Sequence, residues 1–293
     1  MSKSPRIETY QFENHGNLIH CETVGSPSSE TVMIFLHGLA SNATRWHELM
    51  SNLDMNEKSY LLAMDLRGHG HSMTYRKFTR QDWCNDIQAL INTTNRPTIL
   101  VGHSMGAQIA LDYASQNQAH LQGLLLIDPV FPQALTGILK KVSRLRWLIA
   151  GVTFMLRVIH RLGIGRRQYP YRDLQELDQQ TRRFLADNPD KEIADLYMDP
   201  FADLKYIPLV NYLQDQFEVT RKLPPLKKIT VPVMVLLSSG ASTSNVANNR
   251  KMLSTLPDLE IRTIAADHWL LTEKPDEARD IIKTWCRQKL EIS

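Results

Sequence analysis

The chain has 293 residues, of which 43% are hydrophobic and 22% charged, a composition that excludes an intrinsically disordered protein. The net charge is only +3 and no basic run is interleaved with aromatic residues, so nucleic acid is not expected as a partner. The three cysteines, Cys21, Cys84 and Cys286, are far apart, which argues against a disulfide framework or a cysteine-based metal site.

Hydrophobic periodicity predicts two strands at 6–13 and 17–24, joined by a hairpin turn, and then an alternation of strands and helices. The later strands are expected at 31–36, 60–64, 97–102, 121–127, 232–238 and 259–264. The helices are expected at 43–53, 79–94, 105–117, 245–256 and 276–289. This alternation predicts an α/β fold with an eight-stranded, mostly parallel sheet flanked by helices.

The alternation stops between residues 131 and 225, in the connection from the sixth to the seventh strand. Apolar residues recur there at helical spacing, and Gly and Pro residues divide the segment, so four or five short helices are expected. The predicted organisation is a core made of 1–130 and 226–293, interrupted by a helical insertion at 131–225.

The segment from Gly102 to Gly106 reads G-H-S-M-G, a G-x-S-x-G pattern between a predicted strand and a predicted helix. A strand, a sharp turn and a helix are the setting that lifts a serine hydroxyl out of the backbone. A side chain at either glycine would clash across the turn. The context predicts Ser104 as a nucleophile; the alternative is an ordinary strand–helix turn whose serine caps the helix.

Three further segments accompany this turn. The run 32–40 contains His37-Gly38, the segment 62–72 has the pattern D-x-R-G-x-G-x-S, and the segment 267–275 contains His268 before the last helix. With these four motifs, in this order, the chain resembles the α/β-hydrolase fold family over its whole length apart from the insertion. The resemblance implies an esterase- or lipase-like serine hydrolase, and it implies that the insertion is a cap or lid.

Ester hydrolysis needs a nucleophile, a base, a group that orients the base and an oxyanion hole. The resemblance implies Ser104 as nucleophile, His268 as base, and the backbone amides of Leu39 and Met105 as oxyanion hole. Met105 begins a predicted helix, where N–H groups are free. No metal or organic cofactor is implied, and the expected partner is a small-molecule ester.

The acid departs from the common family pattern. Many members carry an aspartate after the seventh strand, but the segment 233–245 contains no Asp or Glu. We therefore expect Asp128, at the end of the predicted strand 121–127, to orient His268. This arrangement resembles pancreatic-type lipases and a branch of small esterases, and it keeps the chain order Ser, Asp, His.

Three alternatives remain for the acid. Asp128, followed by a proline, is also the kind of residue that merely ends a strand. Ser242 or Thr243 would hold the histidine if no acid works, at a large cost in turnover. Asp267 is adjacent to His268 and is poorly placed to reach around to its Nδ1.

The insertion is divided by charge. From Phe131 to Arg172 it has no acid and nine Lys and Arg residues, one of which is Arg144. From Asp173 to Asp203 it has nine acids and three basic residues. One interpretation is a roof over the site, with apolar faces inward and charges in water. The other is that the basic, apolar half also contacts lipid at a membrane surface. We expect a cytoplasmic protein, with membrane association left open, because the N-terminus has no apolar segment typical of a secretory signal.

The motifs do not fix the reaction, because related chemistries share the serine turn. A carbon–carbon bond hydrolase, a thioesterase and an acyltransferase are alternatives to an esterase. From a different class, the rival is a catalytically dead member that only binds a ligand, and the missing acid after the seventh strand is its support.

Overall fold

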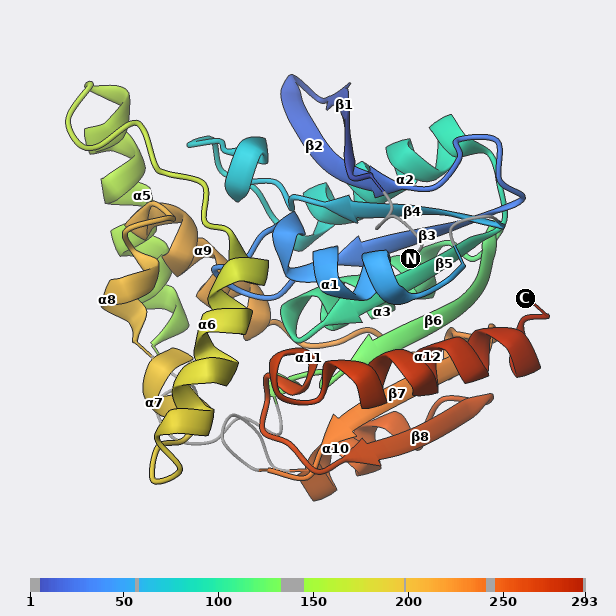
Figure 1. Cartoon of the computed structure of the whole chain (residues 1–293). Helices are drawn as coiled ribbons and strands as arrows, with labels where there is room; N and C mark the ends of the chain where they lie inside the picture. Colours follow the sequence, from blue (N-terminus) through green and yellow to red (C-terminus); the bar gives the residue numbers. More distant parts are fainter. Residues whose placement is uncertain (1–5, 56–57, 133–144, 198, 241–245, 292–293) are drawn as a thin grey trace.

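The computed structural model describes residues 6–55, 58–132, 145–197, 199–240 and 246–291 (Figure 1). A single eight-stranded sheet runs through the core, and helices cover both of its faces. The strands are β1 (Glu8–Asn14), β2 (Asn17–Val24), β3 (Thr31–Leu36), β4 (Ser59–Met64), β5 (Thr98–His103), β6 (Leu121–Ile127), β7 (Val233–Ser238) and β8 (Leu259–Ile264). The predicted eight-stranded sheet is confirmed, with strand ends close to the expected ones.

The strand order is β1-β2-β4-β3-β5-β6-β7-β8. Strand β2 is antiparallel to β1 and β4, and the strands from β4 to β8 in this order are parallel. The carboxyl ends of β3, β5, β6 and β7 therefore meet at one edge of the sheet, where ligands bind in open α/β sheets. The predicted mostly parallel sheet is confirmed.

Two apolar layers hold the helices to the sheet. In β3, Val32, Ile34 and Leu36 belong to the layer under two helices, whereas Met33 and Phe35 face the opposite layer. The period of two follows from the pleat of a strand. The first layer packs against α2 (Arg80–Thr94) and α3 (Met105–Gln116), and the second packs against α1 (His47–Asn52) and α12 (Pro275–Lys289). The described residues also include the core helices α10 (Val246–Leu253) and α11 (Leu270–Glu273) and the short 3-10 helices η1 (Ala43–Trp46), η2 (Gly70–Ser72) and η4 (Leu226–Lys228).

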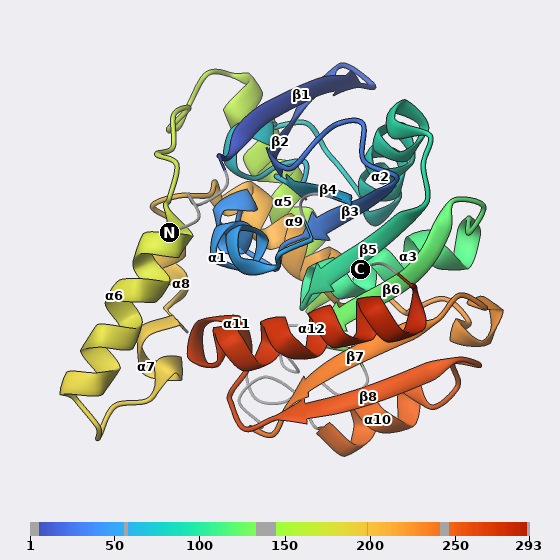
Figure 2. The same ribbon diagram turned by 45° about the vertical axis from the view of Figure 1, so that its right-hand side comes forward.

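Helices also fill the described part of the connection from β6 to β7, where the sequence predicts the insertion (Figures 1 and 2). They are α5 (Arg146–Arg161), α6 (Leu174–Asp187), α7 (Ile193–Tyr197), α8 (Pro200–Asp203) and α9 (Leu209–Val219). Helices α5 and α6 have 16 and 14 residues and are longer than the expected short helices, because neither contains a proline that would end it. Among the helices of the described residues, none has the length and apolar character needed to cross a bilayer.

Helix α9 is fixed to the core by buried polar side chains. Asn211 donates to the carbonyl of Gly68 (2.9 Å), Asp215 lies 3.0 Å from Nε2 of His69, and Glu218 accepts from the N–H of Arg80 (3.1 Å). Burial opposes a charge on His69, but the Asp215 carboxylate outweighs it and the pKa of His69 is raised. Because both side chains of this pair are buried, separating α9 from the core would leave each without its partner.

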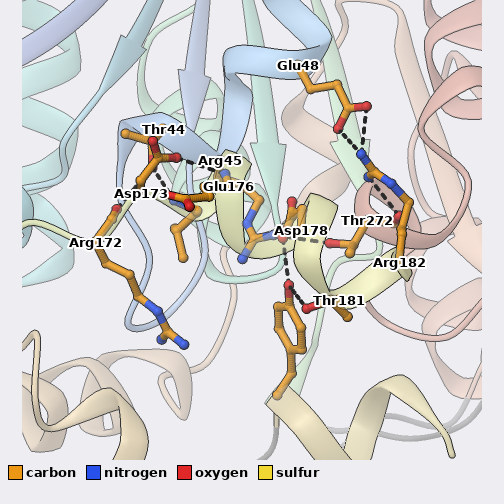
Figure 3. Close-up of polar contacts among 12 residues, drawn as sticks. Thr44, Arg45, Glu48, Arg172, Asp173, Glu176, Asp178, Thr181, Arg182 and Thr272 are labelled. Atoms are coloured by element: carbon orange, nitrogen blue, oxygen red, sulfur yellow. Dashed lines mark hydrogen bonds and ion pairs between the residues drawn. The ribbon is translucent and has the colours of Figure 1, made fainter. Parts of the chain in front are cut away.

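Helix α6 is joined to the core by a second set of polar contacts (Figure 3). The Arg45 guanidinium, in η1, binds the Asp178 carboxylate of α6, and both side chains are almost fully buried. Further along α6, Arg182 donates to both carboxylate oxygens of Glu48 at 2.9 Å and to the carbonyl of Thr272 at 3.1 Å. These two sets of polar contacts hold α9 and α6 at the edge of the sheet where the parallel strands end.

Helix α5 departs in part from the expectation that the insertion turns its apolar faces inward and its charges into water. Arg157 is 7% exposed, whereas Phe154 is 71% exposed. The guanidinium remains inside because its Nη1 donates to the carbonyls of Tyr75 (2.6 Å) and Arg76 (2.7 Å). Satisfied hydrogen bonds offset the cost of burying this charge.

Candidate active site

Ser104 lies in the sharp turn between β5 and α3, with φ +54° and ψ −110°. Few non-glycine residues adopt this backbone, and such strain is typical of functional turns. A Cβ on Gly102 would lie 2.5 Å from the carbonyl oxygen of Gly106, and one on Gly106 would lie 2.1 Å from the carbonyl oxygen of Leu36. The predicted need for glycine at both positions is confirmed.

The structure brings Ser104, His268 and Asp128 together in one hydrogen-bonded row. His268 Nδ1 lies 2.6 Å from Asp128 Oδ2, and His268 Nε2 lies 3.0 Å from Ser104 Oγ. The three residues follow β5, β8 and β6, so they meet at the carboxyl edge of the sheet. Since a carboxylate only accepts, Nδ1 donates to Asp128, which leaves Nε2 free to accept from the serine hydroxyl.

Asp128 is itself held by β7. Ser238 donates both its backbone N–H and its hydroxyl to Asp128 Oδ1, each at 2.9 Å. Burial alone would raise the pKa of Asp128, but hydrogen bonds from His268 and Ser238 outweigh burial and lower it. Asp128 is therefore a carboxylate at neutral pH, with the unusual backbone φ of +40°.

Sequence reasoning missed Ser238. A signal for it does exist, because Ser238 is the last residue of β7 and β7 pairs with β6 in parallel, with Ile127 opposite Leu236. That register places the end of β7 beside the residue that follows β6. Pairing of β6 with β7 was not deduced from the sequence, so the contact could not be anticipated.

Of the other residues considered for holding His268, the structure describes Asp267. The Asp267 carboxylate lies against Gly240, where an added Cβ would come within 2.1 Å of its Oδ1. Its backbone N–H donates to Glu273 at 2.9 Å. Ser242 and Thr243 lie outside the described residues. Of the candidates that the structure describes, Asp128 is the one bonded to the His268 ring.

The loop proposed for the oxyanion hole lies directly against Ser104. A Cβ on Gly38 would lie 3.4 Å from Ser104 Cβ. His37 braces this loop: its Nε2 accepts from the N–H of Leu66 (3.0 Å), so its Nδ1 donates to the carbonyl of Gly38 (2.7 Å). Burial lowers the pKa of His37 and keeps it neutral, as this pattern requires. Leu39, the next residue, lines the same cavity as Ser104 and Met105.

His103 supports the loop that carries His268. Its Nε2 donates to the backbone carbonyl of His268 at 3.2 Å. Burial, and then the nearby His268 ring, lower the pKa of His103 to about 3. A neutral His103 therefore fixes the backbone of His268 without placing a second positive charge beside its imidazole.

A cavity of about 520 Å³ opens onto Ser104 and His268, within the size range of small-molecule sites. Its walls combine the core with the insertion, and its apolar lining includes Leu39, Val130, Leu148, Val152, Leu177 and Leu213. Two arginines also line it, and each is paired, Arg45 with Asp178 and Arg172 with Asp203 (3.2 Å). The arrangement suits an uncharged, apolar group.

The described residues contain no group of three or more His, Cys, Asp or Glu side chains arranged to hold a metal ion. What the site offers is a serine bonded to an imidazole, an imidazole bonded to a buried carboxylate, and a cavity that reaches the serine. Such an arrangement can generate an oxygen nucleophile.

Comparisons with known proteins agree with this architecture. The chain is 26% identical over 265 residues to a Haemophilus influenzae protein named "Putative esterase/lipase", covering 87% of this chain and 81% of that protein. It is 30% identical over 131 residues to the protein phosphatase methylesterase 1 of Bos taurus, but there it covers 42% of this chain and only 34% of the relative.

Among solved structures, the crystal structure of E-2-(acetamidomethylene)succinate hydrolase has the same fold. Its TM-score is 0.68 at 20% identity, covering 95% of this chain and 98% of that one. The family described as "Alpha/beta hydrolase family" matches residues 33–281. The chain therefore belongs to the α/β-hydrolase family, among hydrolases that include esterases and lipases.

Proposed function

We propose that the protein is a serine hydrolase that cleaves carboxylic esters with apolar acyl groups through an acyl-enzyme. The observation that carries this proposal is the row of hydrogen bonds from Asp128 through His268 to Ser104, at 2.6 and 3.0 Å, at the floor of an apolar cavity. These are the distances expected of a nucleophile, its base and the group that orients the base.

In the proposed reaction, Ser104 Oγ attacks the acyl carbonyl while His268 Nε2 takes the hydroxyl proton. A bond forms between Oγ and the carbonyl carbon, and the oxyanion is bound by the amides of Leu39 and Met105. His268 then returns the proton to the leaving alkoxide as the ester bond breaks. Water, deprotonated by His268, attacks the acyl-enzyme, and the carboxylic acid leaves as Ser104 recovers its proton.

Asp128 has an electrostatic and a positioning role in this scheme. Its carboxylate stabilises the imidazolium that forms when His268 accepts the proton, and it holds the ring in the tautomer that leaves Nε2 unprotonated. The lowered pKa of Asp128 supports this assignment, because the carboxylate is then charged throughout the neutral range. The start of α3 supports the role of Met105, because the helix dipole there favours an anion.

The cavity argues for the substrate class. Its apolar walls gain from excluding water around an acyl chain, whereas its two arginines are already neutralised by Asp178 and Asp203. An anionic substrate would have to displace one of these carboxylates. A neutral ester with an acyl chain of medium length fits this lining better than a small diacid does.

The test is hydrolysis of p-nitrophenyl esters from acetyl to palmitoyl by the wild type and by Ser104→Ala, with labelling of Ser104 by a fluorophosphonate probe. We expect turnover that rises from acetyl toward longer chains and is lost in Ser104→Ala. Labelling of the wild type without turnover of any ester would favour a carbon–carbon bond hydrolase, a thioesterase or an acyltransferase. A wild type that neither labels nor turns over would favour a ligand-binding protein.

A further inference from the structure

We propose that one face of the insertion docks on an anionic phospholipid bilayer and presents the mouth of the cavity to it. The docking face consists of large apolar side chains on α5, on the residue after it and on α8: Trp147, Leu148, Phe154, Met155, Leu162 and Phe201. In Figure 1, α5 and α8 lie at the edge of the molecule away from the sheet. The inference goes beyond ester hydrolysis and does not depend on it.

The first argument is exposure. Trp147 is 77% exposed, Phe154 71%, Leu162 72% and Phe201 80%. Single exposed apolar residues are ordinary on a protein surface, but a contiguous set is typical of a surface that contacts another apolar phase. Full burial of such side chains would contribute to binding in proportion to the area removed from water.

The second argument is that α5 is held in this orientation. Its exposed apolar residues, together with Leu162 directly after it, fall at 147/148, 154/155, 158 and 162, about one or two helical turns apart, and so share one side of the helix. Thr153 and Arg157, on another side, are buried, and Arg157 donates to two backbone carbonyls of the core. Because the inward side is fixed by these hydrogen bonds, the apolar side is left facing outward.

The third argument is charge. From residue 145 to residue 172 the chain has six Lys or Arg residues and no acid. Arg161, at the end of α5, and Arg166 and Arg167, in the segment that follows it, are exposed. Asp199 stands beside Phe201, but its carboxylate accepts from the Phe201 N–H and caps α8 (2.9 Å). An apolar helix side bordered by arginines is complementary to anionic headgroups over an acyl layer. Lys140, Lys141 and Arg144 lie outside the described residues.

The fourth argument connects the docking face with the cavity. Leu148 belongs to the docking face and is 63% exposed, yet it also lines the cavity that contains Ser104. Leu145, at the start of α5, is likewise exposed and lines the cavity. The cavity therefore opens at the docking face, and an acyl chain passes from the bilayer to Ser104 without crossing bulk water.

The experiment is co-sedimentation of the full chain with vesicles, carried out in the Ser104→Ala background so that no lipid is consumed. Vesicles of phosphatidylcholine alone are compared with vesicles that also contain phosphatidylglycerol. The variants are Phe154→Glu and Phe201→Glu, neither of which lines the cavity. The matched control is Leu18→Glu, since Leu18 is 51% exposed and lies on β2, outside the insertion.

We expect binding to the anionic vesicles that weakens with added salt, and about tenfold weaker partitioning for each of the two variants. Leu18→Glu should bind as the parent does, and all variants should keep the parent's thermal midpoint. Three results would overturn the proposal: no vesicle binding by the parent, an equal loss in Leu18→Glu, or a dimer in sedimentation that Phe154→Glu dissolves, which would assign the face to a second copy of the chain. Because the readout is binding by a Ser104→Ala protein, failure here is separate from failure of the ester hydrolysis.

Discussion

Ser238 donates its backbone N–H and its hydroxyl to the same oxygen of Asp128, each at 2.9 Å, while the other oxygen of Asp128 accepts from His268. Many family members carry their acid after the seventh strand, and here the end of that strand carries a hydroxyl that holds the acid of the sixth. Asp128 is thus held from two sides, by His268 after β8 and by the last residue of β7.

Removal of this hydroxyl tests that support. In Ser238→Ala the backbone donor remains, so we expect a loss of about tenfold in kcat with little change in KM, since a hydrogen bond to a charged group contributes about 1.5–3 kcal/mol. The pKa of Asp128 should rise, because one of the bonds that lowers it is gone. The low-pH limb of kcat/KM reports protonation of the hydrogen-bonded His268–Asp128 pair, so it should move to higher pH as well.

The neighbouring Ser239 provides the control, because it is exposed and follows β7 directly. Ser239→Ala should keep the wild-type pH profile of p-nitrophenyl ester hydrolysis. A loss of turnover in Ser238→Ala with an unmoved pH profile would indicate packing damage and would contradict a positioning role.

The assignment of Asp128 as the acid can be tested with two matched Asp→Asn substitutions. Asp128→Asn removes the charge that stabilises the imidazolium, and we expect kcat to fall by about 10⁴. Asp267→Asn changes the residue beside His268, whose carboxylate faces Gly240 instead of the imidazole, and we expect turnover near that of the wild type. Steady-state kinetics on one ester decide the matter, and equal losses in the two variants would remove Asp128 from its assigned role.

The ion pairs between the core and α6 allow a prediction about stability. Arg45 and Asp178 are both nearly buried, so Arg45→Met leaves the Asp178 carboxylate with the Tyr197 hydroxyl but without its counter-ion, and should cost about 3–5 kcal/mol. Arg182 and Glu48 are each 28% exposed, so Arg182→Met should cost about 1 kcal/mol or less. Urea unfolding of both variants measures the difference, and equal costs would show that the buried pair adds nothing beyond the exposed one.

The Glu22 carboxylate predicts a pH dependence of stability. Burial opposes the charge of Glu22, but the nearby His20 and the hydrogen-bonded His47 outweigh it and lower the pKa of Glu22 from 4.5 to about 2. A lowered folded-state pKa adds stability that is present above pH 4.5 and is lost as the pH falls toward 2.

Glu22→Gln should therefore lower the free energy of unfolding by about 1–2 kcal/mol at neutral pH, less than the full shift implies because the carboxylate keeps some contact with water. The difference from the wild type should shrink as the pH falls toward 2. Glu13→Gln, on the exposed side of β1, is the control and should show no such trend. A difference for Glu22→Gln that is independent of pH would rule out the ionisation as its cause.

The sequence predicted those features that depend on local pattern. Alternation of apolar residues predicted the strands, and the glycines around Ser104 predicted the turn. The clash at Gly102 is local, with the backbone of Gly106, whereas the clash at Gly106 is with Leu36 on β3. Asp128 was found by elimination and by its place at a strand end. The orientation of α5 was not predictable. Arg157 is buried because its guanidinium donates to the carbonyls of Tyr75 and Arg76, which lie about 80 residues away in the sequence.

The buried polar contacts of α9 have a consequence for how the chain unfolds. Without the insertion, His69 and Arg80 in the core would lose partners that are themselves shielded from water. The boundaries near 130 and 226 therefore separate core and insertion in the sequence only. The two parts should unfold together, in one calorimetric transition. A fragment lacking 131–225 should not retain native heat capacity or secondary structure, and grafting a different insertion onto this core would require replacing the residues beneath it as well.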